Sequence, residues 1–274
     1  IGEIMEVKKR RGRPPRNQFQ QDVTPKVIDF KSLTRLNDLD IDPRMLETMP
    51  SGIELIDEFI SHEGGVPCST NIMVIGDPGV GKTSILLDTL SSIEKSGRKC
   101  LFISGEMNEI DLYGYVKRFP KFAKLPIMFM GDYSDCPKEA IEQVFDQGYD
   151  VVLIDSWAEV TSMVQDQNGW ARKKVESWLL DLLDKNNKGE NQAKKNTAFI
   201  CIQQMTKAGE FAGSNRIKHM TTAMAQLRFD GRGYDAERYI EFDKNRRGGV
   251  GEKIFFSLSR GGKVDYSFET VDED

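Results

Sequence analysis

Eight consecutive residues, GDPGVGKT from Gly76 to Thr83, have the types and spacing that bind a polyphosphate. The stretch lies between an apolar run and a helical pattern, the strand-to-helix context that such a glycine-rich loop requires. The glycines let backbone N–H groups face the phosphates, and the helix N-terminus adds a favourable dipole. Lys82 would reach the β- and γ-phosphates, and the Thr83 hydroxyl would bind Mg²⁺. We therefore predict a site for ATP and Mg²⁺ formed by Gly76, Asp77, Pro78, Gly79, Val80, Gly81, Lys82, Thr83 and Ser84.

Two carboxylates stand just after apolar runs, where they could act on the bound nucleotide. Asp155 ends VVLID and would lie at the carboxyl edge of a sheet beside the phosphates, where it can hold the magnesium shell. Glu106 follows LFISG and could polarise the water that attacks the γ-phosphate. The alternatives are an ordinary strand-terminal acid at Asp155 and a helix N-terminal acid at Glu106, which the helix dipole would favour. Glu109 competes with Glu106 for the water-activating role.

The elements that would position these groups alternate between strands and helices. Short apolar runs rich in β-branched or aromatic residues are typical of parallel strands buried on both faces. After Phe229 the pattern changes to strands without long helices, which indicates an antiparallel meander. We therefore expect an α/β fold with a mostly parallel central sheet flanked by helices and an antiparallel extension. The expected strands are 71–76, 99–104, 126–130, 150–155 and 197–203, the expected helices are 53–60, 82–96, 108–119, 137–147 and 170–186, and 184–196 is expected to be a polar surface loop.

Composition limits the class of protein. The chain has 274 residues, 38 Lys and Arg against 43 Asp and Glu, and a formal net charge of −5, so its average charge does not favour nucleic acid. Four cysteines occur without a CxxC pair, which fits reduced thiols in a reducing compartment. No apolar stretch reaches the roughly 18 residues that span a bilayer. These features predict a cytoplasmic protein without a disulfide or a cysteine-ligated zinc site.

Several stretches resemble one family. SGIELIDEFI, GGVPCSTNIMVIGDPGVGKTS, ISGE, QMTKAGEFAGSNRIKHM and DKNRRGG are similar to the RecA-like ATPase core of bacterial RadA/Sms proteins, relatives of RecA recombinases and DnaB-type replicative helicases. The resemblance covers roughly residues 50–260, and the KNRxG signature from Lys244 to Gly248 is its most specific part. It implies a homo-oligomeric ring, usually a hexamer, with ATP between neighbours and single-stranded DNA threaded through the centre. It also implies that Glu106 activates the attacking water.

Two residues of the predicted site take their roles from this resemblance. In related proteins the KNRxG motif faces the adjacent subunit, so Lys244 and Arg246 would approach the neighbour's γ-phosphate as trans-acting fingers. The alternative is a solvated charge run at the end of a strand. Gln204 stands where the family often has His, and a Gln there resembles the γ-phosphate sensor of RecA.

The chain also departs from the family pattern. RadA proteins usually begin with a four-cysteine zinc module and end with a Lon-protease-like domain, and neither pattern is present. We therefore expect a minimal member, as a phage could encode, acting in the nucleoid or in the cytoplasm of an infected bacterium. Arg247 stands where the family usually has Phe, and its added charge would favour DNA.

Two further segments are candidates for DNA contact. The stretch 205–219 carries Lys207, Arg216 and Lys218 among glycines, so it could bind the backbone of a single strand; the alternative is a solvated surface loop. KRRGRPPR contains Arg11 and Arg13 around a glycine and resembles an AT-hook, which lies in the minor groove of A·T-rich duplex. A nuclear-import signal, an RNA-binding tail and a generic electrostatic tether are the alternatives.

These observations predict four segments and one function. The segments are a flexible basic arm with the AT-hook-like motif (1–24), a linker or clamp (25–50), a RecA-like ATPase domain (51–268) and an acidic tail (269–274). The function is an ATP- and Mg²⁺-dependent motor that performs helicase or branch-migration work on DNA in recombination, repair or replication, alongside other proteins of those processes. A DnaB-like replicative helicase and a non-motor, ATP-gated DNA-binding or assembly factor remain as alternatives.

Overall fold

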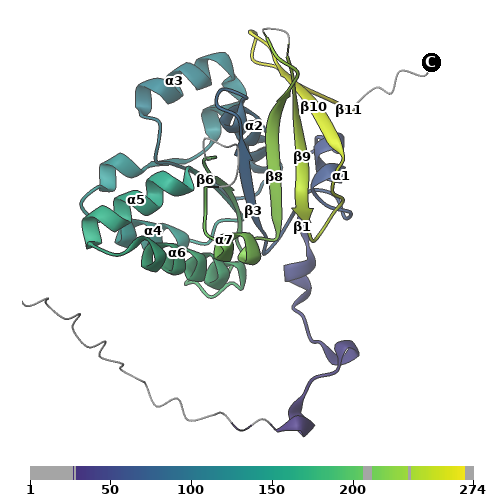
Figure 1. The fold of residues 1–274 in the computed structure, drawn as a ribbon, viewed down its shortest axis with the longest axis vertical. Helices are drawn as coiled ribbons and strands as arrows, with labels where there is room; N and C mark the ends of the chain where they lie inside the picture. The colour runs from purple at the N-terminus through teal and green to yellow at the C-terminus, as the bar shows by residue number, and fades with distance from the viewer. Residues whose placement is uncertain (1–26, 28, 206–211, 234–235, 269–274) are drawn as a thin grey trace, which may run out of the picture. The chain divides into compact units, whose positions relative to one another are not determined.

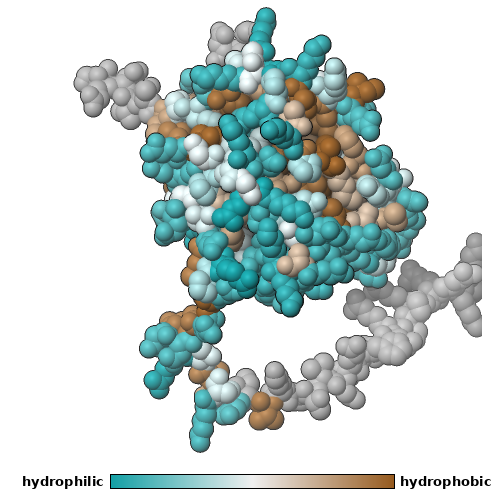
Figure 2. All heavy atoms as spheres, turned by 180° about the vertical axis from the view of Figure 1, so that it is seen from behind, coloured by the Kyte–Doolittle hydropathy of each residue, from teal (hydrophilic) through white to brown (hydrophobic). Residues whose placement is uncertain are grey.

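A computed structural model describes residues 27, 29–205, 212–233 and 236–268. The chain divides into two compact units, Ile1–Asp40 and Ile41–Asp274. In the first unit, the described residues include two short 3-10 turns, η1 (Phe30–Ser32) and η2 (Leu36–Asp38). The described apolar side chains of this unit, Val27, Phe30, Leu33, Leu36 and Leu39, are exposed, and brown, hydrophobic atoms are visible on this segment in Figure 2. The arm motif and the acidic tail lie outside the described residues.

The second unit begins with a small hairpin-like substructure. It contains η3 (Pro43–Leu46), β1 (Thr48–Met49), α1 (Glu54–Ile60) and β2 (Val66–Pro67), with β1 and β2 antiparallel. The buried carboxylate of Asp57 accepts hydrogen bonds from Ser51 N (2.8 Å), Ser51 Oγ (2.7 Å) and Gly52 N (2.9 Å). These bonds compensate for burying a charge, and they fix the chain where it enters α1.

The main sheet positions the candidate site. Its order in the described residues is β11-β10-β9-β8-β3-β7-β6-β4-β5, parallel from β8 to β5 and antiparallel from β8 to β11 (Figure 1). Strands β3, β7, β6 and β4 therefore end at the same edge. The strands are β3 (Asn71–Gly76), β4 (Cys100–Ser104), β5 (Ile127–Phe129), β6 (Val151–Asp155), β7 (Ala198–Ile202), β8 (Ala223–Asp230), β9 (Glu237–Asn245), β10 (Lys253–Leu258) and β11 (Val264–Phe268).

Helices cover both faces of this sheet. Side chains of α2 (Lys82–Lys95), α3 (Glu109–Arg118) and η4 (Pro120–Lys124) pack in one hydrophobic cluster, and those of α4 (Pro137–Phe145), α5 (Trp157–Asn168) and α6 (Arg172–Asn187) in the other. Strand β6 supplies Val151 and Leu153 to the first cluster and Val152 and Ile154 to the second. Residues 151–154 are thus all apolar because each face of the sheet is buried. A short helix, α7 (Asn215–Met220), precedes β8, and η5 (Met130–Tyr133) follows β5.

The expected fold class is confirmed. The sequence analysis omitted α5 and β8, and also shorter elements such as β1, β2 and α7; α7 lies within the stretch 205–219, which was expected to be a loop. Helix α5 lies directly after β6. Its buried residues Val160, Thr161 and Val164 follow a helical spacing that the sequence analysis did not use. Strand β8 alternates buried and half-buried residues over AMAQLRF, and it joins the parallel and antiparallel parts of the sheet. No helix in the described residues is long and apolar enough to cross a membrane.

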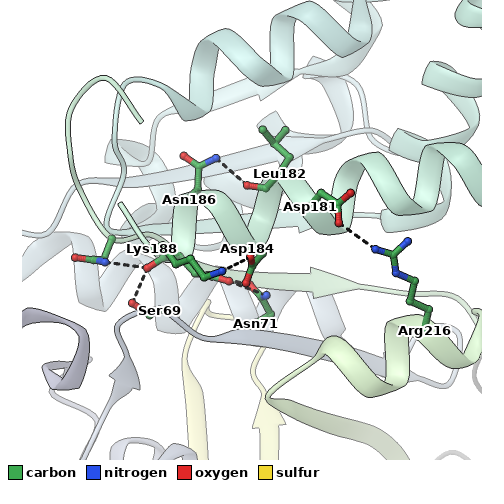
Figure 3. A network of polar contacts seen from close by, with 10 residues as sticks. Ser69, Asn71, Asp181, Leu182, Asp184, Asn186, Lys188 and Arg216 are labelled. Atoms are coloured by element: carbon green, nitrogen blue, oxygen red, sulfur yellow. Dashed lines mark hydrogen bonds and ion pairs between the residues drawn. The ribbon is translucent and has the colours of Figure 1, made fainter. Parts of the chain in front are cut away.

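The polar stretch 184–196 also differs from the expected surface loop. Helix α6 continues to Asn187, and Asn186 and Asn187 are buried. Asn187 Nδ2 donates to Asn71 Oδ1 (3.1 Å) and to Thr197 O (2.8 Å), and Asn186 Nδ2 donates to Leu182 O (2.9 Å, Figure 3). Amide side chains can be buried here because their donors and acceptors are paired.

Candidate ATP-binding site

The stretch GDPGVGKT forms the turn between β3 and α2. Gly79 and Gly81 have φ angles of 74° and 100°, the left-handed region that a side chain disfavours. A Cβ on Gly81 would lie 2.6 Å from Leu258 Cδ1, and a Cβ on Gly76 would lie 2.5 Å from Leu227 O. The loop therefore needs glycine at Gly81 for conformation and space, and at Gly76 because β8 passes so close.

Strand β8 fixes the second residue of the loop. Asp77 N donates to Leu227 O (3.0 Å), and the Asp77 carboxylate accepts from Phe229 N (3.1 Å) and Arg228 Nη1 (3.2 Å). The Asp77 side chain thus serves as an anchor for the loop. This role was not part of the sequence prediction, which gave Asp77 only as a nucleotide-binding residue.

The Lys82 ammonium group lies folded over the loop. Lys82 Nζ donates to Gly76 O and Asp77 O, both at 3.0 Å. Burial lowers the pKa of Lys82, and the nearby carboxylates of Asp155 and Glu106 oppose this shift. A partly buried cation held by carbonyl dipoles is placed to bind an anion that reaches the loop.

The three oxygen ligands predicted for metal and water activation meet beside Lys82. Thr83 Oγ1 donates to Asp155 Oδ2 at 2.7 Å. Asp155 is only 2% exposed, and its pKa is raised to about 6, mainly by burial; the Thr83 hydroxyl and Lys82 lower the pKa and Glu106 raises it. Ser104 pairs with Asp155 across β4 and β6, so Glu106, two residues later, lies at the same edge.

These donors fit Mg²⁺. A hydroxyl and carboxylates are hard oxygen ligands, and the ion keeps several waters and phosphate oxygens rather than a full protein cage. No group of three or more His, Cys, Asp or Glu side chains in the described ranges could hold a metal by itself. Among the described residues, the buried Asp155 carboxylate accepts a hydrogen bond from the neutral Thr83 hydroxyl, so a divalent cation would add positive charge beside it.

These residues line one cleft of about 910 Å³. This volume is at the upper end of the range for small-molecule sites. Glu106 and Gln204 line the cleft, whereas Glu109, the alternative to Glu106, begins α3 and is not among the lining residues. The cleft is also lined by residues that sequence reasoning missed, namely Met107, Tyr115, Arg118, Ser156, Gln203, Met205, Arg238 and Leu258. Only Met205 falls in a stretch that the sequence analysis singled out for function; the others come together through the order of the strands and the position of α3.

Gln204 connects the cleft to the stretch 205–219. Its backbone O accepts from Ala212 N (3.2 Å), and its N donates to the side chain of the buried Gln203 (3.0 Å). Gln203 Nε2 in turn donates to Ala212 O (3.3 Å). The predicted γ-phosphate sensor is therefore joined to the middle of the predicted DNA segment through two backbone groups of Ala212.

The KNRRG turn does not line the cleft of its own chain. Lys244 Nζ donates to Lys218 O and Thr221 O, both at 2.6 Å, and Arg246 Nη2 donates to His219 O at 3.3 Å. Burial lowers the pKa of Lys244, and the charge of Arg246 adds to this effect. Both predicted fingers thus bind carbonyls at the end of α7.

The remaining residues of this turn hold it against α1. Asn245 Nδ2 donates to Ile60 O at 2.9 Å. A Cβ on Gly248 would lie 2.7 Å from Asn245 Nδ2 and 3.0 Å from Ile60 O. The asparagine and the glycine of the motif are therefore explained by contacts within the chain.

The predicted DNA residues occupy different settings. Arg216 Nη2 forms an ion pair with Asp181 Oδ1 (3.0 Å, Figure 3), and Arg216 also contacts Ser177 Oγ. Arg216 lines a second cleft of about 670 Å³ with Arg172 and Lys173. Lys218 lies on α7 and Arg247 is exposed. Lys207, Arg11 and Arg13 lie outside the described residues.

Comparison with known proteins gives a consistent group of similarities. The KaiC ATPase family model matches residues 49–122. The DNA repair protein RadA of Campylobacter jejuni is 26% identical over 201 residues, which cover 73% of this chain and 43% of RadA. RadA of Mycobacterium tuberculosis strain H37Rv is 25% identical over 224 residues, covering 81% of this chain and 44% of RadA. The chain thus spans less than half the length of the curated relatives it matches.

Solved structures show the same fold. A KaiC-like protein from Pyrococcus horikoshii matches with a TM-score of 0.58 and 19% identity over 81% of this chain and 99% of that protein. The flagellar accessory protein FlaH from Methanocaldococcus jannaschii matches with a TM-score of 0.58 and 14% identity over the same shares. At these identities the match concerns the arrangement of helices and strands.

Proposed function

We propose that this chain, a RecA-like P-loop ATPase with a RadA-like core, hydrolyses ATP with Mg²⁺ and uses the hydrolysis to act on single-stranded or branched DNA in recombination, repair or replication. The meeting of Lys82, Thr83, Asp155 and Glu106 in one cleft carries the proposal. The similarity to RadA supports the choice of DNA as the substrate.

The chain's own residues divide the chemistry between them. The loop backbone and Lys82 would bind the β- and γ-phosphates, and Lys82 would stabilise the charge that develops on them. When bound, Mg²⁺ supplies positive charge to the phosphate oxygens, and Thr83 and Asp155 would hold it. Glu106 would orient a water molecule and accept its proton as that water attacks the γ-phosphate. Gln204 would hydrogen-bond the γ-phosphate and sense its loss.

The proposal includes a homo-oligomeric ring, with six subunits as the expected number. Lys244 and Arg246 do not line the cleft of their own chain, so they would act on ATP only across an interface. Because both bind carbonyls of α7, a movement toward a neighbour's γ-phosphate would release the end of that helix. Helix α7 overlaps the end of the predicted DNA segment and carries Arg216 and Lys218, so hydrolysis in one subunit could shift DNA contacts in the next.

The DNA contacts are assigned to two regions. Lys207, Arg216, Lys218 and Arg247 would bind the phosphates of a single strand in the ring centre, because cations favour sequence-independent binding to the backbone. Arg11 and Arg13 would bind A·T-rich duplex through the minor groove and raise the avidity of the ring. The DNA substrate places the protein in the bacterial cytoplasm.

Strand separation provides the test. Wild type, Glu106→Gln and Glu109→Gln are compared on a forked DNA duplex with ATP and Mg²⁺, and the release of the labelled strand is measured. Glu109→Gln is the matched control because Glu109 is an exposed acid three residues away. We expect Glu106→Gln to lose at least about a hundredfold in rate, the usual contribution of a general base. Equal rates in all three proteins would exclude Glu106 as the catalytic residue.

The match to the KaiC ATPase family model favours one second candidate. In this alternative, ATP controls assembly or DNA binding and no translocation occurs. ATP-dependent DNA binding without any strand separation, on forks of either polarity, would support this second candidate over the motor.

A further inference from the structure

The ATP cleft has two ends, which the sheet order defines. Glu106 and Asp155 follow β4 and β6, and Gln204 follows β7, all on one side of β3. On the other side lie β8, β9 and β10, which bring Arg238 and Leu258 to the cleft. If the γ-phosphate lies beside Glu106 and Gln204, the rest of the nucleotide extends toward β9 and β10.

Arg238 is held at this second end by two aromatic neighbours. It lies opposite Phe229 across β8 and opposite Phe256 across β10. Its guanidinium carbon is 5.5 Å from the centroid of the Phe229 ring. Because Phe229 N also donates to Asp77, the same residue fixes both the phosphate loop and Arg238.

The Arg238 guanidinium has an unused donor. Its Nε is buried and has no hydrogen-bond partner in the described part of the chain. No ion pair joins it to a described carboxylate. A buried, unpaired donor costs stability, so its retention in a ligand cleft points to a ligand contact.

The other two cations that line the cleft are already engaged. Lys82 donates to Gly76 O and Asp77 O. Arg118 donates to Leu258 O (3.2 Å) and Ser259 O (2.9 Å), and so joins α3 to the end of β10. Arg118 therefore positions the wall of the cleft, and Arg238 is the cation at this end with a buried donor to offer.

We infer that Arg238 binds the nucleoside part of a nucleotide held by its own subunit, with Nε–H donating to an acceptor of the nucleoside and the planar guanidinium lying against the purine base. The inference rests on the proposed function, because it needs ATP to occupy this cleft. A guanidinium stacks on flat π-systems, which an ammonium group cannot imitate. Tyr115, on α3, lines the same cleft and offers a second aromatic surface. The phosphates, in contrast, would be bound by the loop and Lys82.

The test separates the base from the phosphates. Calorimetry measures the affinity of a non-hydrolysable ATP analogue and of inorganic tripolyphosphate, each with Mg²⁺, for wild type, Arg238→Ala and Arg238→Lys. The matched control is Lys253→Ala, because Lys253 lies 4.5 Å from the Tyr239 ring on the neighbouring strand and does not line the cleft. Thermal unfolding without ligand checks that every variant is folded.

Base–aromatic and base–guanidinium stacking contributes about 5- to 100-fold in affinity, so we expect Arg238→Ala to weaken the ATP analogue about tenfold or more. Tripolyphosphate affinity should stay within about twofold of wild type, and Arg238→Lys should not restore binding of the analogue. If Arg238→Ala weakens the affinity for both ligands equally, Arg238 contacts the phosphates instead. If it changes neither affinity, Arg238 only packs against Phe229. Both results overturn the inference. If wild type binds neither ligand, the proposed ATP site itself fails.

Discussion

Replacing Asp155 by Asn should stabilise the protein in the absence of metal and nucleotide. Asp155 is buried and faces Thr83, Glu106 and Lys82, and the balance raises its pKa to about 6. The charged form is therefore unfavourable in the folded state until a cation binds. Asn removes this charge at nearly the same volume, and its side-chain oxygen can still accept the hydrogen bond from Thr83 Oγ1.

The direction and magnitude follow from linkage. A carboxyl that titrates near 6 when folded and near 4 when unfolded binds its proton more tightly in the folded state. The free energy of unfolding therefore falls as pH rises from about 4 to about 6, and the carboxyl causes no further change above this range. Below about pH 4 both states are protonated and the penalty vanishes. The penalty is about 1.5 kcal/mol at pH 5 and about 3 kcal/mol at pH 8, where it is complete.

Urea unfolding in EDTA at several pH values between 5 and 8 measures the effect. We expect the advantage of Asp155→Asn over wild type to grow by about 1.5 kcal/mol across this range. The control is Asp150→Asn at the other end of β6, where the carboxylate accepts from Lys99 N (2.7 Å) and from Lys195 Nζ (3.2 Å). That substitution should destabilise the protein. An Asp155→Asn protein that is less stable than wild type at pH 8 would refute the reasoning.

Two further predictions concern the KNRRG turn. Gly248→Ala should lower the free energy of unfolding by about 1–3 kcal/mol, because the added Cβ would crowd Asn245 Nδ2 and Ile60 O. Gly249→Ala is the control, because a Cβ there meets nothing within 4 Å, and it should change the free energy of unfolding little. Chemical denaturation measures both. Lys82→Ala and Lys244→Ala should each lack ATP hydrolysis, yet a mixture of the two proteins should regain part of it, because some interfaces then pair an intact phosphate loop with an intact Lys244. If the mixture stays inactive although mass measurement shows mixed oligomers, action across the interface is contradicted.

The sequence predicted those parts of the fold whose signals are local. Residues 151–154 of β6, for example, are all apolar because both faces of the sheet are covered, and the phosphate loop combines a strand, glycines and a helix start in one short stretch. Helix α5 was missed because it follows β6 directly and has only a short stripe of buried residues. Strand β8 was missed because its alternation is short and lies between a helix and a turn.

The rest of the candidate site depends on sheet order, which local patterns do not contain. Arg238 reaches the cleft only because β9 lies beside β8, with Arg238 opposite Phe229. The bonds of Lys244 and Arg246 to α7 likewise need β9 to end beside the start of β8, where Ala223 pairs with Asn245. The anchor role of Asp77 follows from the same neighbour, since its partners Arg228 and Phe229 lie on β8.

Steady-state ATP hydrolysis tests the central claim most directly. Wild type, Lys82→Ala and a chain without residues 1–16 are compared with Mg²⁺, alone and with single-stranded DNA or A·T-rich duplex. We predict that single-stranded DNA stimulates ATP hydrolysis and that Lys82→Ala abolishes it. Removal of residues 1–16 should mainly weaken the protein's apparent affinity for DNA. Negligible hydrolysis that no DNA stimulates would contradict the motor and leave an ATP-controlled binding or assembly factor.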